Sequence, residues 1–286
     1  MSDLDPRQNA FRIDLADEAL RGKVESARFT KGEMRQIICP VASVLKTPAS
    51  DSPQTTQALF GEMCTVFEER DGFAWVQLQQ DHYVGYVASA ALSAEIFQPT
   101  HRVSTSSTLL YPVADLKSHP VKFLPMNAQV QVAGNSGNFA HLSSGGYIFA
   151  SHLASRNEVA PDFVSVARNF LDVPYYWGGK TTQGIDCSGL VQISLQASGK
   201  IAPRDSDLQE KSLGTPVNHF KNFLRGDLIF WPGHVGIMHS ATQLLHANGH
   251  FMKVVCEPLQ DTVERAGSPI RSVRRLSEYH HIPAAK

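Results

Sequence analysis

The sequence predicts an α+β fold for the C-terminal half of the chain, preceded by an all-β N-terminal half. Residues 36–155 read as short alternating strands separated by Gly, Asp and Asn turns, which is typical of small β domains. Further along, Leu190, Ile193 and Ala197 recur at helical spacing, and residues 226–247 return to strand-like runs. A chain of 286 residues is long enough for two or three such domains.

Composition and charge describe an ordinary globular protein, with 42% hydrophobic and 19% charged residues. A net charge of −1 gives no basic surface for nucleic acid or an anionic membrane, so neither is an expected partner. The sequence has no apolar run long enough to span a bilayer, and its start, Met1–Arg7, lacks a signal-peptide pattern. We therefore expect a cytoplasmic protein, and the sequence leaves its oligomeric state open.

The β-like half contains a faint duplication. The run that begins at Phe73 is repeated at Phe139, and the run that begins at Gly85 is repeated at Gly146. The repeated runs are 66 and 61 residues apart, and this spacing predicts two tandem domains of about sixty residues each. The expected organisation is a polar arm at 1–35, small barrels at 36–97 and 98–157, and the α+β domain at 158–286.

Cys187 is a candidate nucleophile because of its place at the head of a predicted helix. Asp186 is a natural N-cap, so Cys187 would be the first helical residue. The positive end of the helix dipole favours a thiolate there, and a protonated histidine nearby would favour it further. A small buried thiol is the alternative. Cys39, Cys64 and Cys256 lack this context, and without a CxxC pair no metal site is expected.

Two later histidines lie on strand-like segments. His234 opens a strand after a Pro-Gly turn, and the two-residue period places His239 on the opposite face. A hairpin to the next strand would bring His246 beside His234, where it could fix the ring orientation of a general base. A thiol at a helix start, followed by two such histidines, is the layout of a papain-like cysteine peptidase.

Together with Pro174–Gly179, these segments resemble the NlpC/p60 family of cell-wall peptidases from Pro161 to the C-terminus. The resemblance implies that Cys187 is the nucleophile, His234 the base and His246 the orienting residue. It also implies that the Tyr175 hydroxyl and the Cys187 backbone N–H stabilise the oxyanion, and that Trp177 forms a wall of the substrate cleft. Without the resemblance, the rings of this segment are an aromatic core patch.

The resemblance further implies a set of substrate contacts. The segment Pro203–Gln209 matches a family stretch in which Ser206 lines the pocket and Arg204 belongs to the same binding set. Asp186 and Ser188, on either side of the nucleophile, would contact the D-glutamyl part of the substrate. Read alone, the first of these segments is a polar helix start capped by its Asp or Ser.

In the N-terminal half, residues 59–87 resemble a bacterial SH3 domain, and the second repeat is a degenerate copy. In the cytoplasmic members of the family, a glutamate and a tyrosine of this domain meet the free amino end of the substrate. By motif these are Glu62 and Tyr83, although Glu68 or Glu69 could replace Glu62. A solvated surface charge is the alternative for Glu62.

The function that the resemblance implies is a cysteine endopeptidase without a cofactor. Its substrate would be a murein peptide, L-Ala-γ-D-Glu-diamino acid, cut after D-glutamate during the recycling of wall peptides. A CHAP-type amidase or peptidase is a second possibility, and a non-catalytic protein that binds wall peptides is a third. The motifs around Cys187 and Arg204 favour the first, and the preferred diamino acid stays open.

Overall fold

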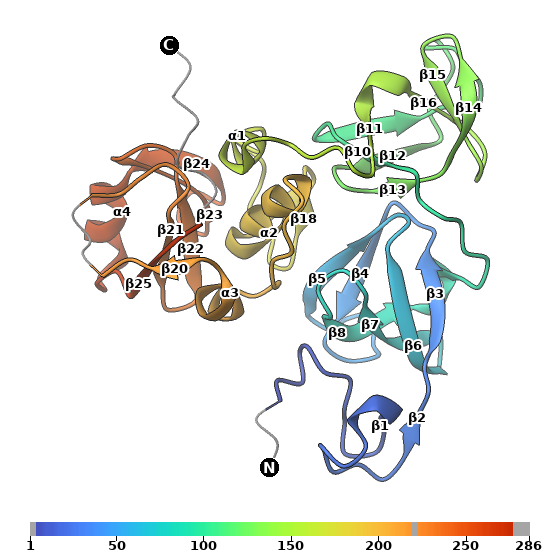
Figure 1. Cartoon of the computed structure of the whole chain (residues 1–286), viewed down its shortest axis with the longest axis horizontal. Helices are drawn as coiled ribbons and strands as arrows, with labels where there is room; N and C mark the ends of the chain where they lie inside the picture. Colours follow the sequence, from blue (N-terminus) through green and yellow to red (C-terminus); the bar gives the residue numbers. More distant parts are fainter. Residues whose placement is uncertain (1–3, 219–221, 277–286) are drawn as a thin grey trace. The chain divides into compact units, whose positions relative to one another are not determined.

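The computed structural model describes residues 4–218 and 222–276 of the chain, whose course is drawn in Figure 1. It separates into two compact units, residues 1–158 and 159–286. Parts of the expected arm (1–3) and of the expected C-terminal domain (219–221 and 277–286) lie outside the described residues. Among the described residues, no helix is long and apolar enough to cross a membrane.

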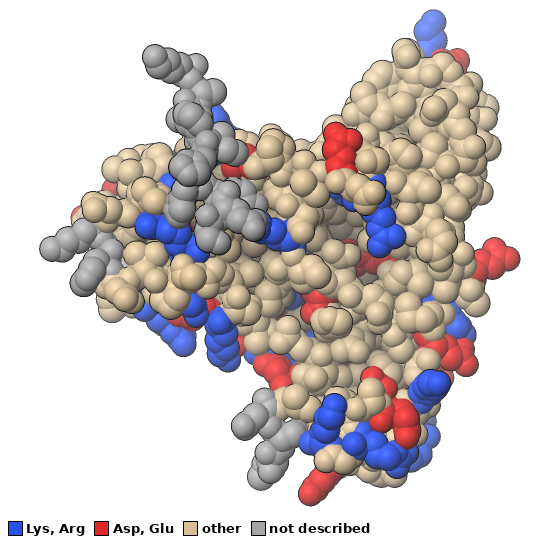
Figure 2. Space-filling model, in the orientation of Figure 1, with Lys and Arg blue, Asp and Glu red and all other residues tan. Residues whose placement is uncertain are grey.

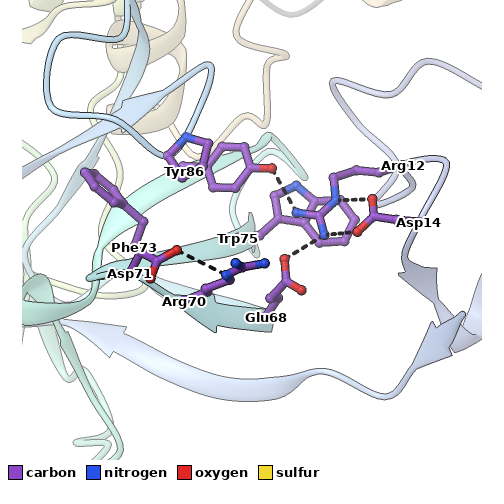
Figure 3. Close-up of a pocket in the computed structure, with 9 residues that line it drawn as sticks. Arg12, Asp14, Glu68, Arg70, Asp71, Phe73, Trp75 and Tyr86 are labelled. Atoms are coloured by element: carbon purple, nitrogen blue, oxygen red, sulfur yellow. Dashed lines mark hydrogen bonds and ion pairs between the residues drawn. The ribbon is translucent and has the colours of Figure 1, made fainter.

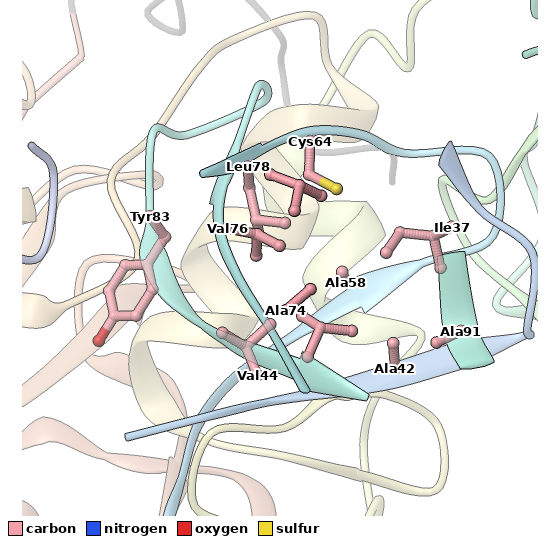
Figure 4. Packing of buried hydrophobic residues seen from close by; sticks show 12 residues of the cluster. Ile37, Ala42, Val44, Ala58, Cys64, Ala74, Val76, Leu78, Tyr83 and Ala91 are labelled. Atoms are coloured by element: carbon pink, nitrogen blue, oxygen red, sulfur yellow. The ribbon is translucent and has the colours of Figure 1, made fainter. Parts of the chain in front are cut away.

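The first part of the N-terminal unit is a seven-stranded sheet with the order β5-β4-β8-β7-β6-β3-β9. Its pairings are antiparallel, as expected for strands joined by short turns. The sheet buries an aliphatic core that includes Val44, Val76 and Leu78 (Figure 4). Its strands are β3 (Glu33–Ile37), β4 (Val41–Leu45), β5 (Gln54–Leu59), β6 (Met63–Arg70), β7 (Phe73–Leu78), β8 (Val84–Ala88) and β9 (Leu92–Ser93), with the 3-10 helix η2 (Ser89–Ala91) between the last two.

The second part of this unit consists of three smaller antiparallel sheets around its own core, which includes Leu124, Val130 and Ile148. Its elements are β10 (His101–Val103), β11 (Ser107–Leu110), β12 (Lys122–Pro125), β13 (Gln129–Val130), β14 (Val132–Ser136), β15 (Phe139–Leu142), β16 (Tyr147–Phe149), η3 (Ala150–His152) and β17 (Leu153–Ser155). The sheets are β13-β10-β17, β11-β12 and β14-β15-β16.

The duplication seen in the sequence recurs in the order of these elements. The series β7, β8, η2, β9 of the first part is matched by β15, β16, η3, β17 of the second. Both series therefore place a short 3-10 helix between their last two strands. The described strands form open sheets in both parts, so the two closed barrels expected from the sequence are not confirmed.

The arm before β3 packs on the first sheet. It contains β1 (Ala16–Asp17), η1 (Glu18–Leu20) and β2 (Phe29–Thr30). The Arg12 guanidinium lies 4.3 Å from the centre of the Trp75 ring and donates to Glu68 over 2.6 Å and to the Tyr86 hydroxyl over 2.8 Å (Figure 3). These contacts border a cavity of about 340 Å³ and attach the arm to strands β6, β7 and β8.

The C-terminal unit is built on a six-stranded antiparallel sheet with the order β20-β25-β21-β22-β23-β24. Helix α4 lies on one side of this sheet and helices α1 and α2 on the other (Figure 1). The strands of this unit are β18 (Lys180–Thr181), β19 (Gly184–Ile185), β20 (Thr215–Pro216), β21 (Leu228–Trp231), β22 (His234–Met238), β23 (Gln243–Asn248), β24 (Lys253–Pro258) and β25 (Ser272–Arg275). Its helices are α1 (Phe163–Arg168), α2 (Cys187–Ala197), α3 (Ser206–Ser212) and α4 (Leu259–Ala266).

Helix α2 is the buried centre of this unit. Leu190, Ile193 and Ala197 are all buried, which confirms the helical face predicted from their spacing. On the α4 side of the sheet, Ile229, Trp231 and other apolar side chains pack against Leu259 of α4. Since Trp231 pairs with His234, the first histidine of β22 belongs to this same face.

Charged side chains of both signs are interspersed over the surface. The chain has 26 Lys and Arg against 27 Asp and Glu. In the view of Figure 2 these side chains form small mixed groups with uncharged surface between them. The described residues on this face therefore carry no extended area of a single charge.

Candidate functional site

Cys187 is the first residue of α2, as the sequence predicts. Asp186 has extended backbone angles, and its Oδ1 accepts the Gly189 N–H over 2.7 Å, which makes it the N-cap. The thiol is buried, and the backbone N–H of Val235 donates a hydrogen bond to it. The helix start therefore brings the sulfur to the strand that begins with His234.

His234 and His246 lie side by side on neighbouring strands. The Nε2 atom of His234 is 2.8 Å from the Nδ1 atom of His246, and their ring centres are 5.1 Å apart. The hairpin expected from the sequence produces this contact. His239 points elsewhere, to Arg225, whose guanidinium lies 3.1 Å from its Nδ1 atom.

The pKa shifts of the thiol and of the first histidine oppose the thiolate and protonated histidine that the sequence suggests. Burial, assisted by the negative charge of Asp186, raises the pKa of Cys187. Burial, assisted by the neighbouring His246 ring and by the positive charge of Arg265, lowers the pKa of His234 to about 3. The helix dipole favours a thiolate, whereas burial opposes it. Both shifts favour a neutral thiol and a neutral imidazole at rest, in which case the proton moves as the sulfur attacks.

A buried polar cluster lies directly beneath the helix start. Arg204 donates to Asp186 over 2.7 Å and to the Ser188 hydroxyl over 2.8 Å. The backbone N–H of Gly178 donates over 2.7 Å to Asp186 Oδ2, the same oxygen that Arg204 contacts. Arg204 is only 1% exposed, so the geometry favours a supporting position for it over the predicted substrate contact. The substrate contacts expected of Asp186 and Ser188 stay predictions.

Helix α3 packs against this cluster through Gln209. Its side-chain amide donates to the backbone oxygens of Ser188 and Pro203, each over 2.9 Å. Ser206 is the first residue of the helix and is half-buried, whereas Asp205 is the N-cap without a side-chain capping bond. The glutamine of this motif thus joins α3 to the nucleophile helix, and the substrate role of Ser206 stays a prediction.

The aromatic segment before the nucleophile is only partly buried. Burial raises the pKa of Tyr175, and charge on Cys187 and Asp186 raises it further, so the phenol lies within electrostatic range of both. Tyr176 is 45% and Trp177 is 66% exposed. The aromatic core patch is therefore wrong for these two rings, while the expected oxyanion role of Tyr175 and cleft role of Trp177 stay predictions.

The glycines around the nucleophile are explained by close backbone approaches. A Cβ atom on Gly179 would lie 2.4 Å from the Gly184 oxygen, and one on Gly189 would lie 2.3 Å from the Gly179 oxygen. Gly178 adopts a φ of +76°, which favours glycine. A side chain at Gly179 or Gly189 would push the loop away from α2 and disturb the Asp186 cap.

Glu62 and Tyr83 belong to the N-terminal unit. Glu62 is 2% exposed, so the alternative of a solvated surface charge is wrong. Tyr83 is 4% exposed and packs at the edge of the aliphatic core near Val76 and Leu78 (Figure 4). Of the two alternatives to Glu62, Glu68 pairs with Arg12 and Glu69 is exposed. The contact of Glu62 and Tyr83 with a substrate amine stays a prediction.

Three polar residues beyond His246 were missed by the sequence analysis. Glu257 lies on β24, and its Oε1 atom is 2.8 Å from the Nε2 atom of His246. Thr262 and Arg265 of α4 both donate to this carboxylate. The sequence feature that could have identified Glu257 is the Asn248-Gly249 turn. A hairpin closed at this turn places Glu257 diagonally opposite His246.

A cavity of about 310 Å³ adjoins the two histidines. It is lined by Trp231, Pro232, His234, His246, Asn248, Gly249, His250, Thr262, Arg265, Ala266 and Ser268. Within residues 4–218 and 222–276, no group of three or more His, Cys, Asp and Glu side chains is arranged to hold a metal ion. The chemistry offered by the described site is that of a thiol, an imidazole pair and a carboxylate.

Comparison with known proteins identifies related sequences for both units. Residues 172–266 match the NlpC/P60 family, and residues 44–92 match the bacterial dipeptidyl-peptidase SH3 domain. Dipeptidyl-peptidase 6 of Lysinibacillus sphaericus is 30% identical over 64% of this chain and 66% of its own length. The gamma-D-glutamyl-L-lysine dipeptidyl-peptidase of Bacillus subtilis (strain 168) is 28% identical over 69% of this chain and 73% of its own length. The chain thus spans about two thirds of the length of these relatives.

A solved structure supports the same assignment at the level of the fold. The NlpC/P60 family protein from Bacillus cereus ATCC 10987 superposes with a TM-score of 0.71 over 85% of this chain and 99% of that chain, at 20% identity. The match at residues 172–266 contains the thiol, both histidines and the carboxylate of the site. Through these segments and the fold around them, the chain belongs to the NlpC/P60 family.

Proposed function

We propose that the chain is a cysteine endopeptidase that hydrolyses the bond between the γ-carboxyl group of D-glutamate and the following L-diamino acid. Its substrate is a murein peptide with a free N-terminal L-Ala. Relatives named dipeptidyl-peptidase 6 and gamma-D-glutamyl-L-lysine dipeptidyl-peptidase support this substrate class. The second of these names contains the bond that we propose.

One observation carries the proposal of cysteine catalysis. The buried thiol of Cys187 stands at the start of α2 with the Val235 N–H directed at its sulfur, and the preceding strand residue, His234, contacts His246 at 2.8 Å. A nucleophile, a base and a group that orients the base are thus contributed by α2, β22 and β23. This is the set of roles that acyl transfer to a thiol requires.

The proposed reaction proceeds through a thioester. As the Cys187 sulfur attacks the γ-carbonyl carbon, its proton passes to His234, and the carbonyl oxygen becomes an oxyanion near the Tyr175 hydroxyl and the Cys187 N–H. Collapse breaks the C–N bond, and His234 returns the proton to the leaving amine of the diamino acid. A water molecule, deprotonated by His234, then releases L-Ala-γ-D-Glu and restores the thiol.

The rest of the chain fits this proposal as a domain arrangement. We assign residues 44–92 to the SH3-like domain that matches the bacterial dipeptidyl-peptidase family and treat 98–157 as a second, degenerate copy. Free recycled peptides, in the cytoplasm, are the proposed substrates. Glu62 and Tyr83 are proposed to recognise the free amine of L-Ala.

The test uses purified full-length protein and the tripeptides L-Ala-γ-D-Glu-L-Lys and L-Ala-γ-D-Glu-meso-diaminopimelate, with products identified by mass spectrometry. The expected products are L-Ala-γ-D-Glu and the free diamino acid. The matched control is the α-linked isomer of the lysine peptide, which should stay intact. N-acetylation of the γ-linked peptide should lower kcat/KM by about tenfold or more, on the scale of a lost charge-assisted contact.

Other products would assign the site to a different class. Release of L-Ala alone would contradict the proposed bond and favour a CHAP-type activity. Binding of the tripeptide without turnover would favour the non-catalytic alternative.

A further inference from the structure

Glu257 extends the histidine pair into a longer hydrogen-bonded series. His234 Nε2 contacts His246 Nδ1 at 2.8 Å, and His246 Nε2 contacts Glu257 Oε1 at 2.8 Å. His246 therefore uses both of its ring nitrogens in this series, and His234 uses its Nε2. The only ring nitrogen left outside this series is Nδ1 of His234.

The carboxylate decides the direction of every hydrogen bond in the series. An ionised carboxylate only accepts, so His246 must carry its proton on Nε2 to donate to Glu257. A neutral His246 then has a bare Nδ1, which accepts the Nε2–H of His234. With its proton on Nε2, His234 has a bare Nδ1 that can accept a proton.

The charge states agree with this assignment. Burial works to raise the pKa of Glu257, but hydrogen bonds from Arg265, His246 and Thr262 outweigh it and lower the pKa, so the carboxylate is ionised. Burial lowers the pKa of His246 even though Glu257 opposes the shift, so the ring is neutral. Arg265 also adds positive charge near both rings.

Among the residues that the structure describes, Asn248 competes with Glu257 for His246 Nε2. Its amide nitrogen lies 3.0 Å from that atom, and its oxygen is held by the Phe251 N–H over 2.9 Å. If the Asn248 amide donated to His246, Nε2 of that ring would carry no proton, and the direction of the hydrogen bonds in the series would be reversed. The bond to an ionised carboxylate is the stronger of the two, so Glu257 prevails.

We propose that Glu257 is a positioning residue, which fixes the tautomers of His246 and His234 and so leaves His234 Nδ1 free to take the Cys187 proton. This inference rests on the proposed function of the same site. When the proton moves from sulfur to Nδ1, His234 becomes an imidazolium that still donates through Nε2 to His246. The negative charge of Glu257 stabilises that cation through the intervening ring.

The experiment measures the alkylation rate of Cys187 by iodoacetamide in the full chain at neutral pH, with the site of labelling identified by peptide mass mapping. Glu257→Gln removes the fixed acceptor and should slow alkylation by about tenfold or more, the scale of an orienting group. Glu264→Gln is the matched control, because this glutamate of α4 is exposed and accepts from Gln260 of the same helix over 2.8 Å. It should leave the rate unchanged.

Chemical rescue separates positioning from packing. Glu257→Ala removes the carboxylate beside a cavity of about 310 Å³ lined by His246, Thr262 and Arg265. Added formate can enter this space and supply a carboxylate, so it should restore alkylation severalfold in Glu257→Ala and not in Glu257→Gln. A carboxylate that acted only in packing would give no such recovery.

A nitrogen-15 NMR spectrum of the wild-type protein tests the tautomers without any substitution. Both His234 and His246 should be neutral with the proton on Nε2. A proton on Nδ1 of either ring, or an unchanged alkylation rate in a folded Glu257→Gln, overturns the proposal. Alkylation needs no peptide, so a chain that shows the relay but does not cleave the tripeptide contradicts the proposed function alone.

Discussion

Arg204 donates to the Asp186 carboxylate over 2.7 Å, and both side chains are almost fully buried beneath the nucleophile helix. The same carboxylate caps α2 through Gly189 and holds the Gly178 N–H of the preceding loop. One ion pair therefore joins the helix start, the aromatic loop and the segment that leads into α3. Removing one partner of such a pair leaves an uncompensated buried charge, which strongly lowers the free energy of unfolding.

Replacing Arg204 should destabilise the C-terminal unit strongly. Arg204→Met leaves Asp186 as an uncompensated buried charge, and the free energy of unfolding should fall by about 3–5 kcal/mol. Chemical denaturation of the variant measures this loss. Lys253→Met is the matched control, because Lys253 pairs with Asp172 at 2.5 Å but both are exposed. Exposed pairs of this kind contribute only about 0–1 kcal/mol.

The double variant completes this comparison. Asp186→Asn combined with Arg204→Met removes both charges, so its loss should be smaller than the sum of the two single losses. Additive losses would mean that the two side chains act independently and that the ion pair is not what holds the segments together.

Cys187→Ala should abolish peptide hydrolysis while leaving the fold intact, since it removes one sulfur atom and the proposed nucleophile. Tripeptide turnover and circular dichroism measure the two effects. Cys256→Ala is the matched control, because Cys256 is a partly buried free thiol on β24 without a place in the proposed chemistry. Turnover by Cys187→Ala near the wild-type rate would exclude cysteine catalysis.

Local patterns in the sequence predict the parts of this site that depend on neighbouring residues. The spacing of Leu190 and Ile193 predicts the buried face of α2, and Asp186 predicts its start. The two-residue period of β22 predicts which histidine faces His246. Each of these features follows from backbone geometry within one or two elements.

Features that depend on tertiary packing could not be predicted from the sequence. The raised pKa of Cys187 and the lowered pKa of His234 follow from burial, which sums over many distant residues, whereas the helix dipole is local. The position of Arg204 beneath the helix, and of Glu257 beside His246, needs the register of strands and loops. For the same reason, alternating strands predict β structure in the N-terminal unit but not whether its sheets close.

Tyr175→Phe should lower kcat with little change in KM. The phenol hydroxyl is proposed to act on the oxyanion, which exists only after attack, so its loss affects the transition state and not ground-state binding. One such donor contributes about 2.7–4 kcal/mol, or a factor of about 10²–10³ in kcat. Tyr176→Phe, at the neighbouring exposed tyrosine, should leave kcat unchanged. Equal changes in kcat and KM would instead identify Tyr175 as a binding residue.

The pH dependence of kcat/KM distinguishes a neutral pair from a thiolate–imidazolium pair. Burial lowers the pKa of His234 from 6.5 to about 3, so the imidazole stays neutral, and able to accept a proton, as the pH falls through 6.5. Burial also raises the pKa of Cys187 above its ordinary value of 9.0, so the thiol keeps its proton at neutral pH. We therefore expect kcat/KM to be nearly constant between about pH 5 and 8, with no acid limb at the ordinary histidine value.

Iodoacetamide provides the second half of this test, because it reports on the thiol in the absence of peptide. For a neutral pair, His234 assists alkylation at a rate that is constant near neutral pH, and the rate should rise further above about pH 8, because free thiolate forms as the pH approaches the raised pKa of Cys187. The alkylation rate of Cys256 in the same protein gives an internal comparison. Burial raises the pKa of this thiol as well, but Cys256 has no place in the proposed chemistry. A Cys187 rate that stays constant from about pH 5 to about pH 10, without that further rise, would show a preformed thiolate, and the helix dipole would then outweigh burial.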